Sequence, residues 1–369
     1  MRVLVTGGLG FIGSHVVRAL LDRGDQVTIL DARTPPVHDP AHPVQPPEGV
    51  RMVEGDVRDL PSVDDALHGA EAVIHLAAYQ DYGTDHQRFI DVNAGGTALL
   101  IERIAATGTP VGRFVLGSSQ SVYGEGAVDC PTHGVIPAAR RREVDLEAGD
   151  FEARCSQCAK PAPPTNTPPH MTAPVNAYGI SKLAAERLVL NVAPNHGMEG
   201  TALRYAIVHG PGQSPRNAYS GILRAAVLRG LAGERPIVFE DGEARRGYLS
   251  IEDAVSATLL ALDHPEAVGR AFAVSGDRDY SVNELLREIS AATGLDLTPE
   301  FAGFYRIGDV RHTLADTDAL RELGWRPTDD LGPVWREYVD WVQTTGVEAK
   351  VVDQALQDMR SNQVLRPFK

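Results

Sequence analysis

The sequence predicts an α/β protein: a doubly wound parallel sheet followed by a smaller C-terminal α/β lobe. Three observations indicate this fold. Short apolar runs alternate with segments of helical periodicity along the first half of the chain. A glycine-rich turn joins the first of these runs to the first helical segment. The chain has 369 residues, 43% of them hydrophobic, which is enough for a full core and two lobes.

The alternation begins with a strand at Arg2–Thr6, a helix at Ile12–Arg23 and a strand at Gln26–Asp31. The passage Ala32–Gly49 is so rich in proline that it predicts a loop. Further strands are predicted at Arg51–Glu54, Ala72–Leu76 and Arg113–Leu116, with helices near Val63–Leu67 and Phe89–Thr107. Elements in this order make a parallel sheet with helices on both faces.

Residues Glu125–Ala173 interrupt the alternation. They contain all three cysteines, the run Arg140–Arg142 and a proline-rich tract, but little hydrophobic periodicity, so we interpret them as an insertion. Regular elements resume after it. We expect helices at Val175–Asn195, Gly221–Leu231, Asp253–Leu262, Val282–Thr293 and Leu331–Gln343, and strands at Thr201–Ile207, Pro236–Phe239 and Ala271–Val274.

These elements predict a division of the chain into lobes. Residues 1–180 form the first lobe and carry the insertion 125–173. Residues 181–345 form mainly the second lobe, with some elements returning to the first sheet. Residues 346–369 are a tail that we expect to be helical and exposed.

The charge balance excludes some classes of partner. Asp and Glu number 49 against 35 Lys and Arg, giving a net charge of −14, so the chain lacks the basic surface that nucleic acid or anionic lipid demands. No stretch approaches the roughly 20 apolar residues that span a bilayer. The chain opens directly on a strand, without a signal-peptide core, and we expect a cytoplasmic protein.

Gly7, Gly10 and Gly13 form a Gly-x-x-Gly-x-x-Gly loop between the first strand and the first helix. Glycines there permit a tight turn and let backbone N–H groups approach a pyrophosphate at the positive end of the helix. Asp31 ends the second strand, where a carboxylate accepts hydrogen bonds from both ribose hydroxyls and repels a 2′-phosphate. We therefore expect a Rossmann-like site for NAD. The nearby Arg33 instead favours NADP, because a guanidinium there could accommodate its 2′-phosphate.

Tyr178 and Lys182 lie four residues apart on a predicted helix, on the same face and one turn from each other. An ammonium close to a phenol stabilises the phenolate and lowers the pKa of the tyrosine, which can then act as a general base. Lys182 is one of only four lysines in the chain. An ordinary amphipathic helix with a surface lysine is the alternative. The strand that ends near Leu116 supplies Ser119, at the carboxyl end where catalytic groups of such sheets gather.

The sequence resembles the extended short-chain dehydrogenases/reductases, specifically the NAD-dependent nucleotide-sugar epimerase/dehydratase family. The resemblance covers nearly all of residues 1–343 outside the insertion. The matching segments are TGGLGFIGSH (6–15), DVRD (56–59), HLAA (75–78), SSQSVYG (118–124), YGISK (178–182) and RRGYLSIEDAV (245–255).

This resemblance implies roles for individual residues. Ser119, Tyr178 and Lys182 would be catalytic. The cofactor would be bound by Gly7, Gly10, Phe11, Ile12, Gly13, Asp31, Asp56, Val57, Leu76, Ala77, Ala78, Tyr178 and Lys182. The substrate, a nucleotide-diphosphate sugar, would contact Ser119 and Gln120, and Arg246 would grip its diphosphate. The resemblance also implies a homodimer formed through the helices Asn93–Thr107 and Tyr178–Asn195.

Two departures from the family pattern constrain the reaction. Dehydratases place Asp-Glu directly after the catalytic Thr, whereas this chain has Gln120 and Ser121, neither of which can shuttle the proton for water elimination. Ile207 stands where relatives usually have an Asn that touches the substrate, which puts the usual sugar contacts in doubt.

The insertion contains a predicted metal site. Cys130-Pro-Thr-His133 and Cys155-Ser-Gln-Cys158 are two ligand pairs with zinc-ribbon spacing, and a Cys₃His set closes a tetrahedral structural zinc site. The segment has few hydrophobic residues with which to fold, and a metal would supply the missing stability. His170 is a reserve fourth ligand. Unliganded thiols in a loose loop are the alternative.

We therefore expect an NAD-dependent nucleotide-sugar epimerase that acts at C4 through a transient 4-keto sugar. Tyr178 would deprotonate the C4 hydroxyl, Ser119 would polarise the oxygen, and Lys182 would hold the ribose. A net reductase or dehydrogenase is the alternative among enzymes, for which Ile207 and His209 leave room. A non-enzymatic NAD-binding scaffold is the alternative of another class.

Overall fold

The computed structural model describes the whole chain except residues 36, 39–43, 82–84 and 218–220. Positions 36 and 39–43 of the predicted proline-rich loop therefore lie outside the described residues. The described part of Ala32–Gly49 contains neither helix nor strand, as the proline content predicts. No helix of the described residues is long and apolar enough to cross a membrane.

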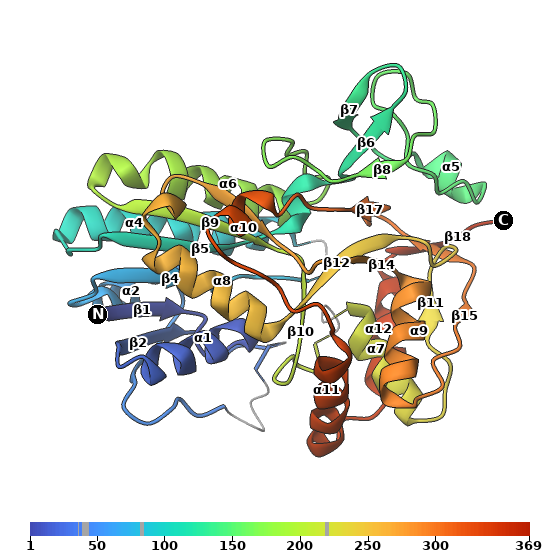
Figure 1. Cartoon of the computed structure of the whole chain (residues 1–369). Coiled ribbons are helices and arrows are strands. Elements are labelled where there is room, and N and C mark those ends of the chain that lie inside the picture. Colours follow the sequence, from blue (N-terminus) through green and yellow to red (C-terminus); the bar gives the residue numbers. More distant parts are fainter. Residues whose placement is uncertain (36, 39–43, 82–84, 218–220) are drawn as a thin grey trace.

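The first lobe is built on a central sheet of seven parallel strands (Figure 1). In chain order they are β1 (Arg2–Thr6), β2 (Gln26–Asp31), β3 (Arg51–Glu54), β4 (Ala72–His75), β5 (Arg113–Ser119), β9 (Glu199–Tyr205) and β13 (Ala271–Val274). Their spatial order is β13-β9-β5-β4-β1-β2-β3, so the winding reverses at β1, between β2 and β4. A crevice opens at such a reversal, outside the carboxyl ends of the strands. The predicted doubly wound, Rossmann-like fold is confirmed.

Helices cover both faces of this sheet. On one face α1 (Phe11–Asp22), α8 (Ile251–Asp263) and the short α10 (Asp318–Glu322) bury Leu20, Ala257 and Leu320. On the other face α2 (Leu60–Leu67), α4 (Gly96–Thr107) and α6 (Ala177–Asn191) bury Leu67, Leu100 and Val189. Because both faces are covered, the strands are apolar on both sides in their middle residues, which is why they are readable as short apolar runs.

The segment predicted as one helix at Phe89–Thr107 is composite. It consists of α3 (His86–Phe89), a π-helical turn at Ile90–Gly95 and α4. Turns of this wider kind are rare and occur mostly at functional sites. The turn contains Asn93, which is buried.

The second lobe has a mixed sheet of β10 (Ile207–His209), β12 (Arg245–Ser250), β14 (Asp279–Ser281) and β17 (His312–Thr313). Its helices are α7 (Gly221–Leu231), α9 (Val282–Thr293), α11 (Gly332–Thr345) and α12 (Lys350–Ser361). They share a core that contains Leu286, Trp335 and Tyr338. Two short strand pairs, β11 (Ile237–Val238) with β15 (Glu300–Phe301) and β16 (Phe304–Arg306) with β18 (Leu365–Pro367), complete it.

The chain passes repeatedly between the two lobes. It leaves the central sheet after β9, returns with α8 and β13, leaves again at β14, and returns once more with α10 before α11.

The tail after residue 345 is helical, as expected, but it is not simply exposed. Val352 of α12 is buried against the core of the second lobe, and Leu365 of β18 is also buried. β18 pairs with β16, a partner that is about 60 residues earlier in the chain and is invisible to local periodicity.

The insertion forms a small lobe of its own that projects from the body of the molecule (Figure 1). β6 (Ala127–Cys130) pairs with β7 (Gly134–Pro137) and with β8 (Pro164–Thr165), both antiparallel, and α5 (Glu143–Glu147) follows β7. Its hydrophobic cluster has only five buried members, Val128, Cys130, Ala153, Cys155 and Ala162. Short 3-10 turns at Gln120–Tyr123, Ala193–His196 and Pro265–Ala267 complete the described helical elements.

Candidate active site

One large cavity, of about 1750 Å³, lies at the carboxyl ends of β1, β2, β4 and β5 and extends under the second lobe. Its wall includes Gly10, Asp31 and Tyr178 from the first lobe and Arg246 and Met359 from the second. Pockets for one drug-sized ligand usually measure about 300–1,000 Å³. This cavity is therefore large enough for a dinucleotide and a second ligand together.

The glycine loop is packed so closely that side chains do not fit. Gly7 has φ +69°, and a Cβ there would lie 2.7 Å from the backbone nitrogen of Ala77. A Cβ on Gly13 would overlap the carbonyl oxygen of Gly7. α1 begins at Gly10 and no side chain caps it. The amides of its first turn and the positive end of the helix therefore face the cavity without a built-in partner, which suits a pyrophosphate.

Asp31, at the end of β2, is buried, and its carboxylate accepts hydrogen bonds from the backbone amides of Leu9 (3.0 Å) and Arg33 (2.9 Å). His38 Nε2 lies 3.1 Å from the same carboxylate. Burial alone would raise the pKa of Asp31, but these hydrogen bonds, that of His38 foremost, hold it below its usual value. The Arg33 guanidinium is turned toward Glu54 (3.3 Å) and the Val44 carbonyl (2.9 Å). Asp31 is thus an ionised carboxylate at the cavity wall, as expected for a site that binds NAD. The Arg33 guanidinium contacts other groups.

The structure brings the other expected cofactor residues to the same cavity. Its wall contains Phe11, Ile12, Asp56, Val57, Leu76, Ala77, Ala78 and Lys182 as well as the glycines and Asp31. This donor set, with a glycine cradle at a helix N-terminus and a carboxylate at the end of β2, fits NAD.

Ser119 and Tyr178 meet although they are 59 positions apart. Ser119 ends β5, and α6 begins at Asn176, whose side chain caps the helix by accepting from the Gly179 amide (2.8 Å). Ser119 is hydrogen-bonded to the Tyr178 phenol. Gln80 Nε2 donates a second hydrogen bond to that phenol, 2.5 Å long. The Tyr178 oxygen is thus held between a hydroxyl and an amide at the cavity wall.

The expected electrostatic effect of Lys182 on Tyr178 is not found. Burial raises the pKa of Tyr178 to about 12, and only the hydrogen bonds from Ser119 and Gln80 oppose this. The Lys182 ammonium donates instead to the Gly117 carbonyl (2.6 Å), and burial lowers the pKa of Lys182 to about 8. Lys182 is thus not among the groups that lower the pKa of the phenol here, one of its three N–H donors is used by a backbone oxygen, and the tuning of Tyr178 by Lys182 stays a prediction.

Two groups that sequence reasoning did not single out as site residues support this arrangement. Gln80 follows β4 at the same edge of the sheet, so its position after a strand end was the available signal. Asn93 in the π-helical turn accepts from the Tyr79 amide (2.7 Å) and donates to Ser181 of α6 (2.9 Å). It thereby ties the segment that carries Gln80 to the helix that carries Tyr178.

A buried ion pair lies behind the catalytic helix. Glu186 of α6 accepts two hydrogen bonds from Arg204 of β9, 2.9 and 2.7 Å long, and a third from Ser118 (2.5 Å). The side chains of Glu186 and Arg204 are 2% and 4% exposed. This pair fixes α6 against the end of β5.

All three residues expected at the substrate, Ser119, Gln120 and Arg246, line the cavity. Gln120 has a buried side-chain oxygen with no hydrogen-bond partner among the described residues. The Arg246 guanidinium donates to the carbonyls of Arg311 (2.8 Å) and Val310 (2.5 Å) and lies 3.4 Å from Asp309. Further arginines that the sequence did not indicate line the second-lobe side, namely Arg216, Arg224, Arg306 and Arg366. In a chain of net charge −14 this concentration of cations suits an anionic group such as a diphosphate.

Of Ile207 and His209, only the first belongs to the cavity wall. His209 is fully buried in the second lobe, 3.3 Å from the indole nitrogen of Trp335, and burial lowers its pKa to about 3. His209 is therefore neutral and is not part of the cavity wall, whereas Ile207 is, so of these two residues only Ile207 bears on the site, and the net-oxidoreductase alternative stays open.

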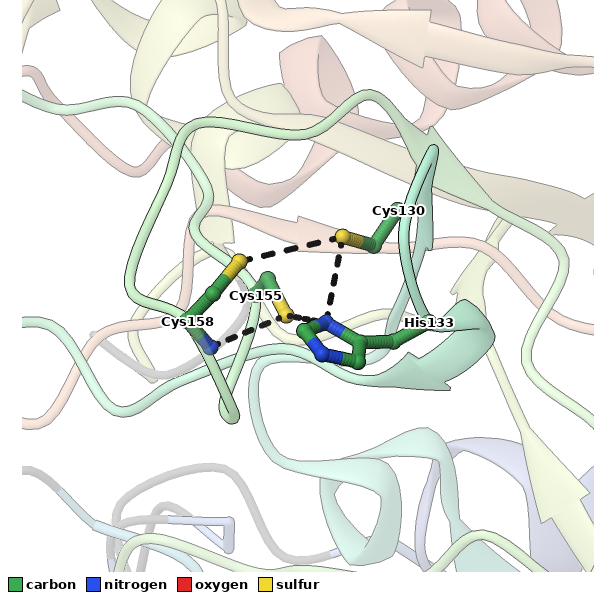
Figure 2. A group of neighbouring side chains, drawn as sticks. All are labelled: Cys130, His133, Cys155 and Cys158. Atoms are coloured by element: carbon green, nitrogen blue, oxygen red, sulfur yellow. Dashed lines mark hydrogen bonds between the residues drawn. The ribbon is translucent and has the colours of Figure 1, made fainter.

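The four expected metal ligands come together in the insertion (Figure 2). One ligand atom from each of Cys130, His133, Cys155 and Cys158 lies within 4.8 Å of every other. His170, the reserve ligand, is not a member of this group.

Comparison with known proteins agrees with this geometry. The model of the family described as "NAD dependent epimerase/dehydratase family" matches residues 3–144 and 153–275, more than half of the chain. The chain is 33% identical to a dTDP-L-rhamnose 4-epimerase of Burkholderia thailandensis over 351 residues, which are 92% of this chain and 94% of that relative.

Two solved structures extend the comparison. The chain is similar to a UDP-glucose 4-epimerase of Thermotoga maritima solved with UDP-glucose, with 28% identity, a TM-score of 0.75, and coverage of 94% of this chain and 99% of the other. It is also similar to the NAD complex of a Thermus thermophilus UDP-glucose 4-epimerase, with 26% identity, a TM-score of 0.71 and coverage of 93% and 99%.

Proposed function

The chain belongs to the NAD-dependent epimerase/dehydratase family, and from that membership we propose that it is an NAD-dependent nucleotide-sugar 4-epimerase. One observation carries the proposal. A single cavity holds the glycine cradle with Asp31, the Ser119–Tyr178 pair and a group of arginines, while Gln120 and Ser121 stand after Ser119. An amide and a hydroxyl at these two positions supply no carboxylate for eliminating water.

The cofactor of this reaction is NAD, held by the glycine loop and by Asp31. When bound, it supplies reversible hydride acceptance at the sugar carbon. Because hydride leaves and returns at the same carbon, the cofactor is regenerated in each cycle and the net change is the configuration of that carbon.

The protein's own groups move the proton and hold the sugar. Tyr178 takes the proton of the C4 hydroxyl as the sugar is oxidised and gives it back when the 4-keto sugar is reduced on its other face. Ser119 donates to the same oxygen and stabilises the charge that develops there. Lys182 holds the nicotinamide ribose. Arg246 and the neighbouring arginines hold the diphosphate, so the sugar can turn over while its nucleotide stays bound.

The test is incubation of the holoenzyme with UDP-, dTDP-, GDP- and ADP-sugars, followed by chromatographic separation of the products. We expect one pair of C4 epimers to interconvert to a fixed ratio with no net absorbance change at 340 nm. Deuterium at C4 of that sugar should slow turnover and be retained in the product. The variant Tyr178→Phe should still bind NAD but convert nothing.

Two results contradict the proposal. Failure to convert any nucleotide sugar would remove it. Stoichiometric formation or loss of NADH with a nucleotide sugar would show a net oxidoreductase instead.

Three further assignments accompany the epimerase. We propose a homodimer formed through α4 and α6, which pack together. Ile180 of α6, which also borders the cavity, is 48% exposed, and Val192, directly after α6, is 37% exposed; these are separate apolar side chains that a second copy would cover. Light scattering should give twice the mass of the chain, and Val192→Glu should give the single mass. A wild type of single mass at micromolar concentration contradicts the dimer.

The second bound group that we propose is zinc, at the Cys/His group of the insertion and with no part in the chemistry. The cytoplasmic location stays a prediction. The three cysteines form no disulfide, which suits a reducing compartment.

A further inference from the structure

The insertion contains two turns of similar backbone form that face each other. In the first, the His133 amide donates to the Cys130 carbonyl (3.1 Å), and Gly134 follows with φ +67°. In the second, the Ala159 amide donates to the Cys155 carbonyl (2.9 Å), and Ala159 itself has φ +57°. Each turn carries two ligand-type side chains and ends in the left-handed region. A non-glycine residue there is uncommon and is kept only where surrounding structure holds the turn.

Three of the six distances between the ligand atoms match the edges of a tetrahedron around zinc, and all six are within 4.8 Å. Zn–S bonds of about 2.3 Å and Zn–N bonds of about 2.0 Å place two sulfurs about 3.8 Å apart and a sulfur and a nitrogen about 3.5 Å apart. In the structure, the sulfurs of Cys130 and Cys158 are 3.9 Å apart. His133 Nδ1 lies 3.5 Å from the Cys130 sulfur and 3.4 Å from that of Cys155. Figure 2 shows the four side chains pointing toward one common centre.

Neither a disulfide nor an ordinary apolar core accounts for the cluster. A disulfide needs sulfurs about 2.05 Å apart, and the 3.9 Å between Cys130 and Cys158 is far beyond that. Ordinary core cysteines would be surrounded by larger apolar side chains. Here two of the five buried members of the local hydrophobic cluster are themselves cysteines, and the other three are Val128, Ala153 and Ala162. Leu146 and Phe151 of the insertion pack elsewhere, against Tyr305, so this small cluster is the only apolar packing around the two turns among the described residues, and it does little to offset the entropy of ordering them.

A backbone donor also points at one of the sulfurs. The Cys158 amide donates to the Cys155 sulfur (3.4 Å). A backbone donor of this kind stabilises a thiolate, the form in which cysteine binds a metal.

We propose that Cys130, His133, Cys155 and Cys158 bind one zinc ion, and that this structural centre orders the part of the insertion that borders the cavity. The four protein ligands fill a tetrahedral zinc site, so no position is open for catalysis. The inference does not rest on the epimerase proposal, because it concerns only the insertion and its contacts.

The second turn also holds the segment of the insertion that follows β7. Ala138 is bridged to Cys155, and the Ala139 amide donates to the Arg154 carbonyl (2.7 Å). The segment that leaves β7 is therefore fixed against the second turn. The next residue, Arg140, lines the cavity.

Arg141 then joins the insertion to the second lobe. It donates to Glu240 (2.8 Å) and to the Asp309 carbonyl (2.7 Å) and lies 3.5 Å from Glu125. The side chains of Arg141, Glu125 and Glu240 are at most 8% exposed. Buried charges of this kind need their partners in position, so loosening the turns should loosen the border of the cavity.

The direct test is metal analysis of protein purified without a histidine tag and dialysed against metal-free buffer. We expect about one zinc per chain, since tight structural sites stay filled. Co²⁺ in place of zinc should give the intense visible absorption of a tetrahedral thiolate complex. Less than about a tenth of an equivalent of zinc, or iron in its place, overturns the proposal.

Matched variants test the ligand set. His133→Ala should lose zinc, whereas His170→Ala, in the same insertion and exposed, should keep about one equivalent. Cys155→Ser should also lose it. Equal zinc content in all three variants contradicts the assignment.

Hydrogen exchange tests the structural role without needing a substrate. When zinc is removed by a chelator, amides at 127–142 and 153–162 should exchange faster, while those of β1, β2 and β4 should not change. The dissociation constant of NAD should stay within about twofold, since binding to one site changes another only through coupling between them. Unchanged exchange at 138–142 after zinc loss would refute the role, and loss of NAD binding would show a global effect instead.

Discussion

Removal of the Gln80 amide should make Tyr178 a weaker base at neutral pH. Gln80 Nε2 donates to the Tyr178 oxygen at 2.5 Å, and this bond is one of the two that oppose the effect of burial on the phenol. Gln80→Leu removes the donor and leaves the Ser119 contact in place. Because the lost bond stabilises the phenolate more than the phenol, the pKa of Tyr178 should rise further above its ordinary value.

The size of this effect follows from the charge on the acceptor. A hydrogen bond to a charged group contributes about 1.5–3 kcal/mol. One pKa unit corresponds to about 1.4 kcal/mol, so the pKa should rise by about one to two units. If Tyr178 must be ionised to act, kcat at pH 7 should fall about 10- to 100-fold, and the alkaline rise of kcat should move to higher pH by the same one to two units.

The assay is the pH profile of epimerisation by the wild type and by Gln80→Leu, with ultraviolet titration of the phenolate as an independent readout. The control is a double-mutant cycle. In a Tyr178→Phe background, Gln80→Leu should have no further effect, because the partner is gone. A profile of unchanged shape, or a loss of equal size in the Tyr178→Phe background, would refute the reasoning.

Three other variants test other parts of the structure. Glu186→Leu leaves Arg204 buried without its carboxylate, so the free energy of unfolding measured in urea should fall by about 3–5 kcal/mol. The control Glu102→Leu, at an exposed position, should lower it by less than about 0.5 kcal/mol. A fall of less than about 1 kcal/mol for Glu186→Leu contradicts this. Asp31→Ala should weaken the binding of NAD and bring the dissociation constants of NAD and NADP closer together. An unchanged ratio of the two dissociation constants would mean that Asp31 does not determine cofactor preference. Ala159→Val should lower the midpoint of thermal unfolding, because a β-branched residue is disfavoured at φ +57°, whereas Ala159→Gly should not lower it. Equal midpoints for the two variants would argue against a strained turn.

Much of the fold was predictable because its signals are local. The ends of α7 and α9 lie where the periodicity places them, and α9 is bounded by a Ser281/Glu284 capping box and by Gly294. The glycine loop was predictable because only glycine fits at Gly7. The meeting of Ser119 and Tyr178 was predictable only through family resemblance, since the insertion separates them.

The missed features depend on partners that are distant in sequence. His38 and Gln80 become site residues only when loops after β2 and β4 fold back over the cavity. Lys182 has the expected neighbour on its helix, yet its ammonium reaches the Gly117 carbonyl of β5, which no helical spacing reveals. The burial of Val352 depends on packing against the core of the second lobe, which the sequence of the tail does not show by itself.

The insertion and the second lobe are connected to the central sheet in different ways, and this determines how easily each could be exchanged between related proteins. The insertion leaves the sheet after Ser119 and comes back before Tyr178, so a single excision or transplant can remove it or carry it into a relative. The second lobe cannot be exchanged in that way, because α8, β13 and α10 return to the first lobe between its segments. Recombination that swaps it must replace several separate stretches at once. Substrate preference in this architecture is therefore more readily altered by point substitutions along the cavity, whereas the insertion can be exchanged as one stretch provided that Glu240 and Asp309, the partners of Arg141, change with it.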